Sequence, residues 1–134
     1  MDIFISIIMI GRNNLFRGYL LLVILHLFHS LEEQIWGANF IGRFYSSYQI
    51  YFSLEIIVLL VAIVIVYFIF KRKIWALKLG LVYSIIMVID GIFHMVELIT
   101  LGKYVGGGAG SITGAILILL GIYLARKTYD VIKS

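Results

Sequence analysis

Two short stretches of the chain place histidines and carboxylates at the spacing of an α-helical turn. The first is the run HSLEE at residues 29–33, and the second is the run DGIFHMVE at residues 90–97. Residues three or four positions apart lie on one face of a helix, so each stretch would present a ridge of acids and histidines. Imidazole and carboxylate groups together suit Zn, Fe or Mn. The predicted ligands of a divalent transition metal are His29, Glu32, Glu33, Asp90, His94 and Glu97, with His26 and Glu55 as further candidates.

A metal held by these residues would support catalysis. A bound metal lowers the pKa of its water ligand toward about 7 and so generates a nucleophile. A carboxylate that is not a ligand, Glu32 or Glu33, would then act as the general base. The same residue types serve zinc hydrolases and di-iron oxidases, so the sequence predicts metal-dependent chemistry and leaves the reaction open.

These residues also have purely structural interpretations. His26 could hydrogen-bond to a backbone carbonyl, Glu55 could point to water from a membrane interface, and Asp90 could bond to a neighbouring helix. The polar residues within 29–33 and 94–97 could form solvated helix ends. A shared site is favoured only if the elements that carry these residues bring them together.

Those elements are predicted to be membrane spans. Hydrophobic residues make up 63% and charged residues 13% of the 134 residues, whereas a soluble domain has roughly 45–50% and ~25%. This composition excludes a soluble domain, a disordered chain and a coiled coil. The absence of cysteine excludes a disulfide scaffold and a thiolate metal site.

A bilayer core of ~30 Å requires about 20 mostly apolar residues per helix, and four stretches of the chain qualify. We therefore predict an all-α bundle of four transmembrane helices in a single domain, residues 1–134. The predicted spans are about 15–33, 50–70, 74–101 and 107–125, preceded by a short interfacial segment at 1–12.

The basic residues predict the orientation of these spans. Of the 11 lysines and arginines, all but Arg43 and Lys103 lie near the two termini or around residues 71–78. The positive-inside rule then places both termini in the cytoplasm, in an integral protein of the cell membrane. The aromatic-rich connection at about 36–49 and the glycine-rich connection at 103–114 would face outward. The net charge of +4 is thus explained by topology, and no nucleic-acid partner is expected.

Depth favours one shared site in the outer part of the membrane. With a rise of 1.5 Å per residue, His29 lies ~21 Å above the start of the first span and Asp90 ~24 Å above the start of the third. Glu55 lies ~7–8 Å below the outer boundary of the second span. Charged groups at such depths cost roughly 2.5–3.5 kcal/mol each on insertion scales, so a metal, shared protons or water should compensate them.

The order of the motifs resembles that of a known family. Residues 29–33 read literally as His-x-x-Glu-Glu. Residues 90–94 (DGIFH) are similar to an Asn-x-x-x-His element, and residues 104–107 (YVGG) with Thr113 are similar to a Tyr-x-Pro-Gly element with a following Thr. Over about residues 15–125 the chain therefore resembles the HXXEE-domain family of small integral membrane proteins.

Two positions depart from the family pattern. Asp90 stands where the family tends to have Asn, and Gly106 stands where it has Pro. The resemblance implies an enzyme-like, metal-dependent polar site in a membrane domain whose activity is not established. The residues to which it carries this implication are His29, Glu32, Glu33 and His94.

Four classes of function remain open. The first is a metal-dependent membrane enzyme, a hydrolase or an oxidase, that acts on a lipid or another apolar substrate. The second is a proton-linked transporter or relay component, although the inner parts of the second and fourth spans contain no carboxylate or histidine. The third is a haem-binding cytochrome, with His94 and either His26 or His29 as axial ligands. The fourth is a structural membrane subunit. The lipid bilayer is the expected partner in each case, and a homo-oligomer is compatible with all of them.

Overall fold

The computed structural model describes residues 2–36, 48–102 and 110–133, and these residues form four α-helices. The helices are α1 (Asp2–Trp36), α2 (Tyr48–Phe70), α3 (Ile74–Leu101) and α4 (Ser111–Lys133). No strand occurs among the described residues, so the predicted all-α fold is confirmed. The expected outward connections fall largely on residues 37–47 and 103–109, which lie outside the described part of the chain.

Three of these helices are long and apolar enough to cross a membrane, and they agree with the first three predicted spans. The stretches are Asn14–Ile35, Ser53–Phe70 and Ile74–Thr100. Helix α4 is not among them, and its last turns carry Arg126, Lys127, Asp130 and Lys133. A fourth span therefore stays a prediction. Helix α1 also continues without a break through residues 2–12, whose location at a membrane interface stays a prediction too.

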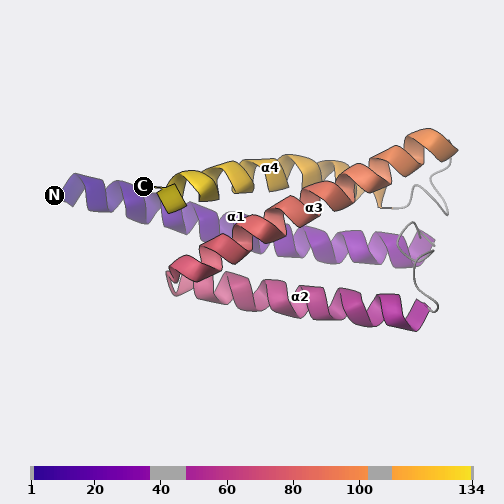
Figure 1. Cartoon of the computed structure of the whole chain (residues 1–134), viewed down its shortest axis with the longest axis horizontal. Helices are drawn as coiled ribbons and strands as arrows, with labels where there is room; N and C mark the ends of the chain where they lie inside the picture. The colour runs from indigo at the N-terminus through magenta and orange to yellow at the C-terminus, as the bar shows by residue number, and fades with distance from the viewer. Residues whose placement is uncertain (1, 37–47, 103–109, 134) are drawn as a thin grey trace.

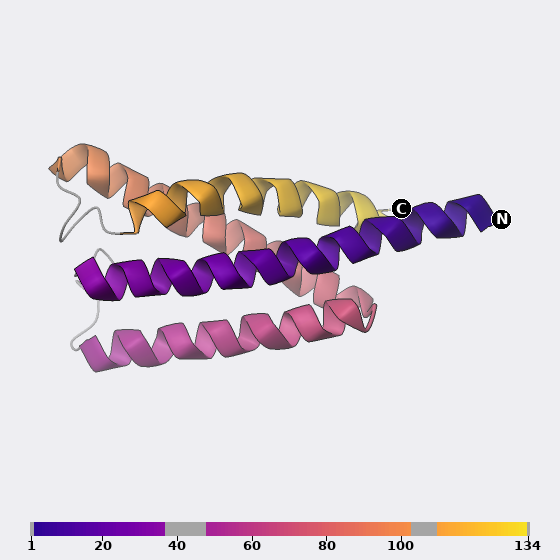
Figure 2. The same cartoon turned by 180° about the vertical axis from the view of Figure 1, so that it is seen from behind.

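Consecutive helices run antiparallel, so both ends of the described chain lie at one end of the bundle (Figure 1). The last turns of α1 and α3 and the first turns of α2 and α4 lie at the opposite end, which we call the site end. Helix α3 crosses the bundle obliquely from the end of α2 toward the start of α4, as the view from behind also shows (Figure 2). The turn between α2 and α3 is short, and Arg72 in it has a φ of 59°.

One face of α1 is buried along the bundle, and its chemistry changes from apolar to polar toward the site end. Leu15, Tyr19 and Leu22 belong to the apolar core, which α2, α3 and α4 complete with residues such as Ile65, Leu77 and Leu124. The same face continues at helical spacing with buried polar residues. These residues are His26, His29 and Glu33. They lie inside the bundle because they share the face of α1 that packs against the core.

Glycines allow α3 and α4 to approach closely. A Cβ added to Gly91 would lie 2.4 Å from the carbonyl oxygen of Gly114, and one added to Gly121 would lie 2.9 Å from that of Ser84. Small residues commonly form such contacts between membrane helices. This packing brings the start of α4 against the part of α3 that carries His94.

Buried hydroxyl groups join three helices in the middle of the bundle. The hydroxyls of Tyr19 on α1 and Thr128 on α4 lie 2.8 Å apart. Ser84 on α3 donates to the Tyr19 oxygen at 3.2 Å and to the carbonyl oxygen of Gly80 at 3.0 Å. The outward faces are apolar instead, with Leu119 72% exposed, as expected of helices that face lipid.

Candidate metal centre

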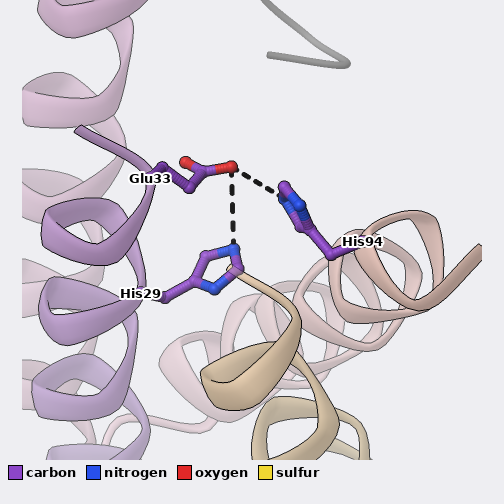
Figure 3. A group of neighbouring side chains, drawn as sticks. All are labelled: His29, Glu33 and His94. Atoms are coloured by element: carbon purple, nitrogen blue, oxygen red, sulfur yellow. Dashed lines mark ion pairs between the residues drawn. The ribbon is translucent and has the colours of Figure 1, made fainter. Parts of the chain in front are cut away.

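Two histidines and one glutamate converge at the site end of the bundle. His29 and Glu33 lie one turn apart on α1, His94 lies on α3, and their exposed fractions are only 1%, 5% and 1%. Glu33 Oε1 lies 2.7 Å from His94 Nε2 and 3.9 Å from His29 Nε2. Figure 3 shows this oxygen directed at both rings. One ligand atom from each residue lies within 4.8 Å of the other two, so the group could hold a metal ion.

The two imidazoles lie edge to face within this cluster. Their ring centroids lie 4.7 Å apart and their planes meet at 77°. Both Nε2 atoms are buried and neither makes an aligned hydrogen bond, although each lies close to a carboxylate oxygen. A buried nitrogen without an aligned hydrogen bond could instead bind a cation that lies to one side of the line between the nitrogen and the oxygen.

Asp90 lies beside the three converging residues and contacts both histidines. Its Oδ2 lies 2.9 Å from Nε2 of His29, and its Oδ1 lies 3.8 Å from Nε2 of His94. Its side chain is 17% exposed, more than those of the other three. The Asp90 carboxylate therefore lies within reach of both histidines, next to the three residues that could hold a metal ion.

Glu32 is adjacent to Glu33 but has different partners. Its Oε1 accepts a hydrogen bond from the backbone N–H of Gly110 at 3.1 Å. Its Oε2 accepts hydrogen bonds from the backbone N–H of Thr113 at 3.2 Å and from the Thr113 hydroxyl. The N-terminal end of a helix leaves N–H groups without intrahelical partners and favours negative charge. Glu32 therefore docks the start of α4 onto the end of α1.

The start of α4 also covers the cluster. The Thr113 hydroxyl oxygen lies 2.8 Å from Nδ1 of His29. Gly110 has a φ of 87°, and a Cβ added to it would lie 2.8 Å from Cε1 of His29 and 3.2 Å from Nδ1 of His94. Glycine is therefore required at this position both by the backbone conformation and by the lack of space.

A second polar cluster lies beside the first, between α1, α2 and α3. Nδ1 of His26 lies 2.9 Å from the Tyr83 hydroxyl, and its Nε2 lies 3.3 Å from Oε2 of Glu55. The Ser30 hydroxyl donates to the same Glu55 oxygen at 2.7 Å. Both ring nitrogens of His26 have partners, so this cluster is better suited to joining helices than to binding a metal.

The structure thus divides the predicted ligands into groups. It brings His29, Glu33 and His94 together and places Asp90 against both histidines. Glu97 is buried one turn beyond His94 and does not belong to the converging group. The remaining candidates have other partners: Glu32 binds the start of α4, and His26 and Glu55 bind each other.

Sequence reasoning expected the site between the first and third spans and missed the contribution of α4. Gly110 and Thr113 contact the cluster directly, while Ser30 and Tyr83 complete the neighbouring one. Thr113 appears in the third motif of the family resemblance, which is the one sequence signal that points to it. Otherwise, the position of a threonine or a glycine in an apolar helix does not show whether the residue contacts a site or only packs against a neighbouring helix.

In the part of the chain that the structure describes, four α-helices form a bundle with buried histidines and carboxylates at one end. A family model described as a protein of unknown function with HXXEE motif matches residues 20–124. The chain belongs to this family, so the resemblance drawn from the motifs is confirmed. Comparisons with curated proteins and with solved structures gave no match.

Proposed function

We propose that this protein is a metal-dependent membrane enzyme whose metal ion is bound by His29, Glu33 and His94. One observation carries the proposal: three ligand atoms from two helices converge within 4.8 Å in the interior of the bundle. The Nε2 atoms of both histidines, which would bind the ion, have no aligned hydrogen-bond partner there. A cation would satisfy them and would compensate the burial of the Glu33 carboxylate.

The distances fit a metal site after small side-chain movements. Ligand atoms bound at about 2.0–2.1 Å to a tetrahedral zinc ion lie ~3.3 Å from one another. The two separations from Glu33 Oε1, 2.7 and 3.9 Å, lie on either side of this value. Two histidines and one glutamate form a ligand set of catalytic zinc sites, which leave a further position to water or substrate. Iron and manganese accept the same donors, but this set favours zinc.

Charge balance supports a divalent ion. The charge of Glu32 is compensated by the N–H groups at the start of α4. With neutral imidazoles, the remaining carboxylates of the cluster, Glu33 and Asp90, together carry two negative charges. A divalent cation would neutralise them.

The arrangement supplies separate residues for metal binding and for proton transfer. Asp90 is the carboxylate closest to the histidine nitrogens after Glu33 and is more exposed than Glu33. We assign it the role of general base toward a nucleophilic water. Glu32, which the sequence predicted as a catalytic carboxylate together with Glu33, instead accepts hydrogen bonds from the start of α4. This chemistry is hydrolysis if the metal is zinc, and oxidation becomes the alternative if it is iron.

The proposal includes four spans with both termini in the cytoplasm. It is supported by three helices that are apolar enough to cross a membrane, by their antiparallel order and by the basic residues at the end of the bundle opposite the cluster (Figure 1). The apolar outward faces continue along the helices that carry the cluster. A lipid or another apolar molecule is therefore the proposed class of substrate.

The other classes of function receive less support. Proton transport would need carboxylates or histidines along the whole length of the bundle. Between His26 and the end that holds both chain ends, the buried polar residues that the structure describes carry hydroxyls instead: Ser84 and Thr128, with Tyr19 beside them. For a haem, His29 and His94 would have to flank a macrocycle, and ring centroids 4.7 Å apart leave no space for one.

Elemental analysis of the detergent-purified protein tests the proposal. We expect near-stoichiometric zinc, iron or manganese in the wild type and its loss from a variant with both His29→Ala and His94→Ala. His26→Ala is the matched control, because this histidine is also buried on α1 but lies outside the converging group. The proposal is wrong if the wild type stays free of metal after reconstitution with each ion, or if the double variant retains the metal.

A further inference from the structure

The hydrogen bonds around Glu32 have a defined direction. Two backbone N–H groups, of Gly110 and Thr113, donate to its oxygens, so the carboxylate acts as an acceptor. The Thr113 hydroxyl oxygen lies so close to Glu32 Oε2 that a hydrogen must lie between them. Because the carboxylate accepts, that hydrogen belongs to Thr113.

This direction determines what His29 does at its Nδ1 atom. A threonine hydroxyl has one hydrogen to donate, and here it is engaged by Glu32. The other acceptor near this hydroxyl is the Gly110 carbonyl oxygen at 3.3 Å, and donation there would engage the same hydrogen. The Thr113 oxygen must then accept at its 2.8 Å contact with His29, so Nδ1 of His29 carries a hydrogen and donates it.

A hydrogen on Nδ1 leaves the other nitrogen of the ring for the metal. Nε2 of His29 faces Asp90 at 2.9 Å and Glu33 at 3.9 Å, on the side of the converging ligand atoms. Histidines that bind metals usually donate their second N–H to a fixed acceptor, which sets the tautomer and the orientation of the ring. The hydroxyl of Thr113, held by Glu32, is such an acceptor.

We propose that Thr113 and Glu32 are positioning residues that hold the hydrogen of His29 on Nδ1 and thereby present Nε2 to the metal. The adjacent glutamates of the His-x-x-Glu-Glu motif then have different tasks: Glu33 is a ligand, and Glu32 acts through Thr113 on the histidine of the same motif. The proposal rests on the proposed metal site, but it also makes a claim about the metal-free protein.

If Thr113 served only to dock α4 onto α1, removal of its hydroxyl would leave the hydrogen of His29 on Nδ1. The backbone N–H groups of Gly110 and Thr113 would still dock α4 onto Glu32 if the hydroxyl were removed. Thr113→Val and Thr113→Ala therefore remove the acceptor for His29 and keep the docking contacts. Thr113→Ser is the matched control, because it keeps the hydroxyl.

Nitrogen NMR of the protein with labelled histidines, in detergent and without metal, measures where the hydrogen lies. We expect Nδ1 of His29 to carry a hydrogen in the wild type and in Thr113→Ser. In Thr113→Val and Thr113→Ala it should lose this hydrogen, because Nδ1 then lacks the acceptor, whereas Nε2 keeps its position 2.9 Å from Asp90. His26 serves as an internal reference, because its partners are Tyr83 and Glu55.

Competition with a zinc chelator provides the second readout. Loss of the acceptor should weaken zinc binding about 10- to 100-fold, while Thr113→Ser should stay within a few-fold of the wild type. Unchanged nitrogen signals of His29 together with unchanged zinc affinity in both hydroxyl-free variants would overturn the positioning role. A wild type that has the expected hydrogen on Nδ1 but binds no metal would instead overturn the proposed function alone.

Discussion

Replacement of Gly110 by alanine tests whether the start of α4 covers the cluster. A Cβ at this position would lie 2.8 Å from Cε1 of His29 and 3.2 Å from both Cγ of Glu33 and Nδ1 of His94. The residue also has a φ of 87°. A left-handed backbone costs a residue with a Cβ about 1–2 kcal/mol, and extra atoms in a packed site cost about 1–3 kcal/mol. Gly110→Ala should therefore lower the free energy of unfolding by about 2–5 kcal/mol.

Gly102 offers a matched control for the backbone contribution. It has a φ of 60°, and a Cβ added there would meet nothing within 4 Å. Gly102→Ala should therefore cost only about 1–2 kcal/mol. Unfolding in detergent, monitored by circular dichroism, gives both free energies. Competition with a zinc chelator should show zinc binding weakened at least about tenfold in Gly110→Ala and unchanged in Gly102→Ala, because only Gly110 packs against the residues that would bind the metal. Equal unfolding energies and equal zinc affinities in the two variants would refute the idea that Gly110 packs on the ligands.

Three further outcomes are expected. Glu33→Gln should abolish metal binding, as measured by elemental analysis, whereas Glu97→Gln, also a buried acid, should retain it; equal metal content would contradict the assignment of ligands. Tyr19→Phe should reduce the free energy of unfolding by about 0.5–1.5 kcal/mol, because it removes the hydroxyl between Ser84 and Thr128, and no change would mean that these contacts do not stabilise the bundle. A cysteine at Arg72 should react with an impermeant reagent from the cytoplasmic side and one at Gly102 from the other side; labelling of both from one side would refute the proposed orientation.

The main elements of the fold could be predicted from the sequence because their signals are local. Long apolar runs without proline define helices by length alone, and α2 and α3 begin and end within a few residues of their predicted limits. The start of α1 was harder to predict, since residues 2–12 are too few to span a bilayer by themselves. The structure joins them to the following span as one helix.

The candidate site could be predicted only as far as helical spacing reaches. Spacing along one helix identifies which residues share a face, and this criterion selected His26, His29 and Glu33 on α1 and Asp90, His94 and Glu97 on α3. It could not tell that His26 and Glu97 lie outside the converging group. It placed Glu33 on the face of His29 and Glu32 beside that face, but it could not assign their different roles, because adjacent residues differ by about 100° in direction and either could face a neighbour. That distinction depends on where the start of α4 lies, which is a long-range property of the packed bundle.

The contacts of Glu32 with α4 also affect the order in which the protein can be assembled. Thr113 follows His29 by 84 residues, so a ribosome completes the His-x-x-Glu-Glu segment long before the residue that fixes its histidine exists. During that interval the end of α1 holds two carboxylates and a histidine whose partners have not yet been made. The polar end of the bundle therefore cannot be completed until the start of α4 has been made, and substitutions there should appear first as a failure of newly made chains to complete their folding.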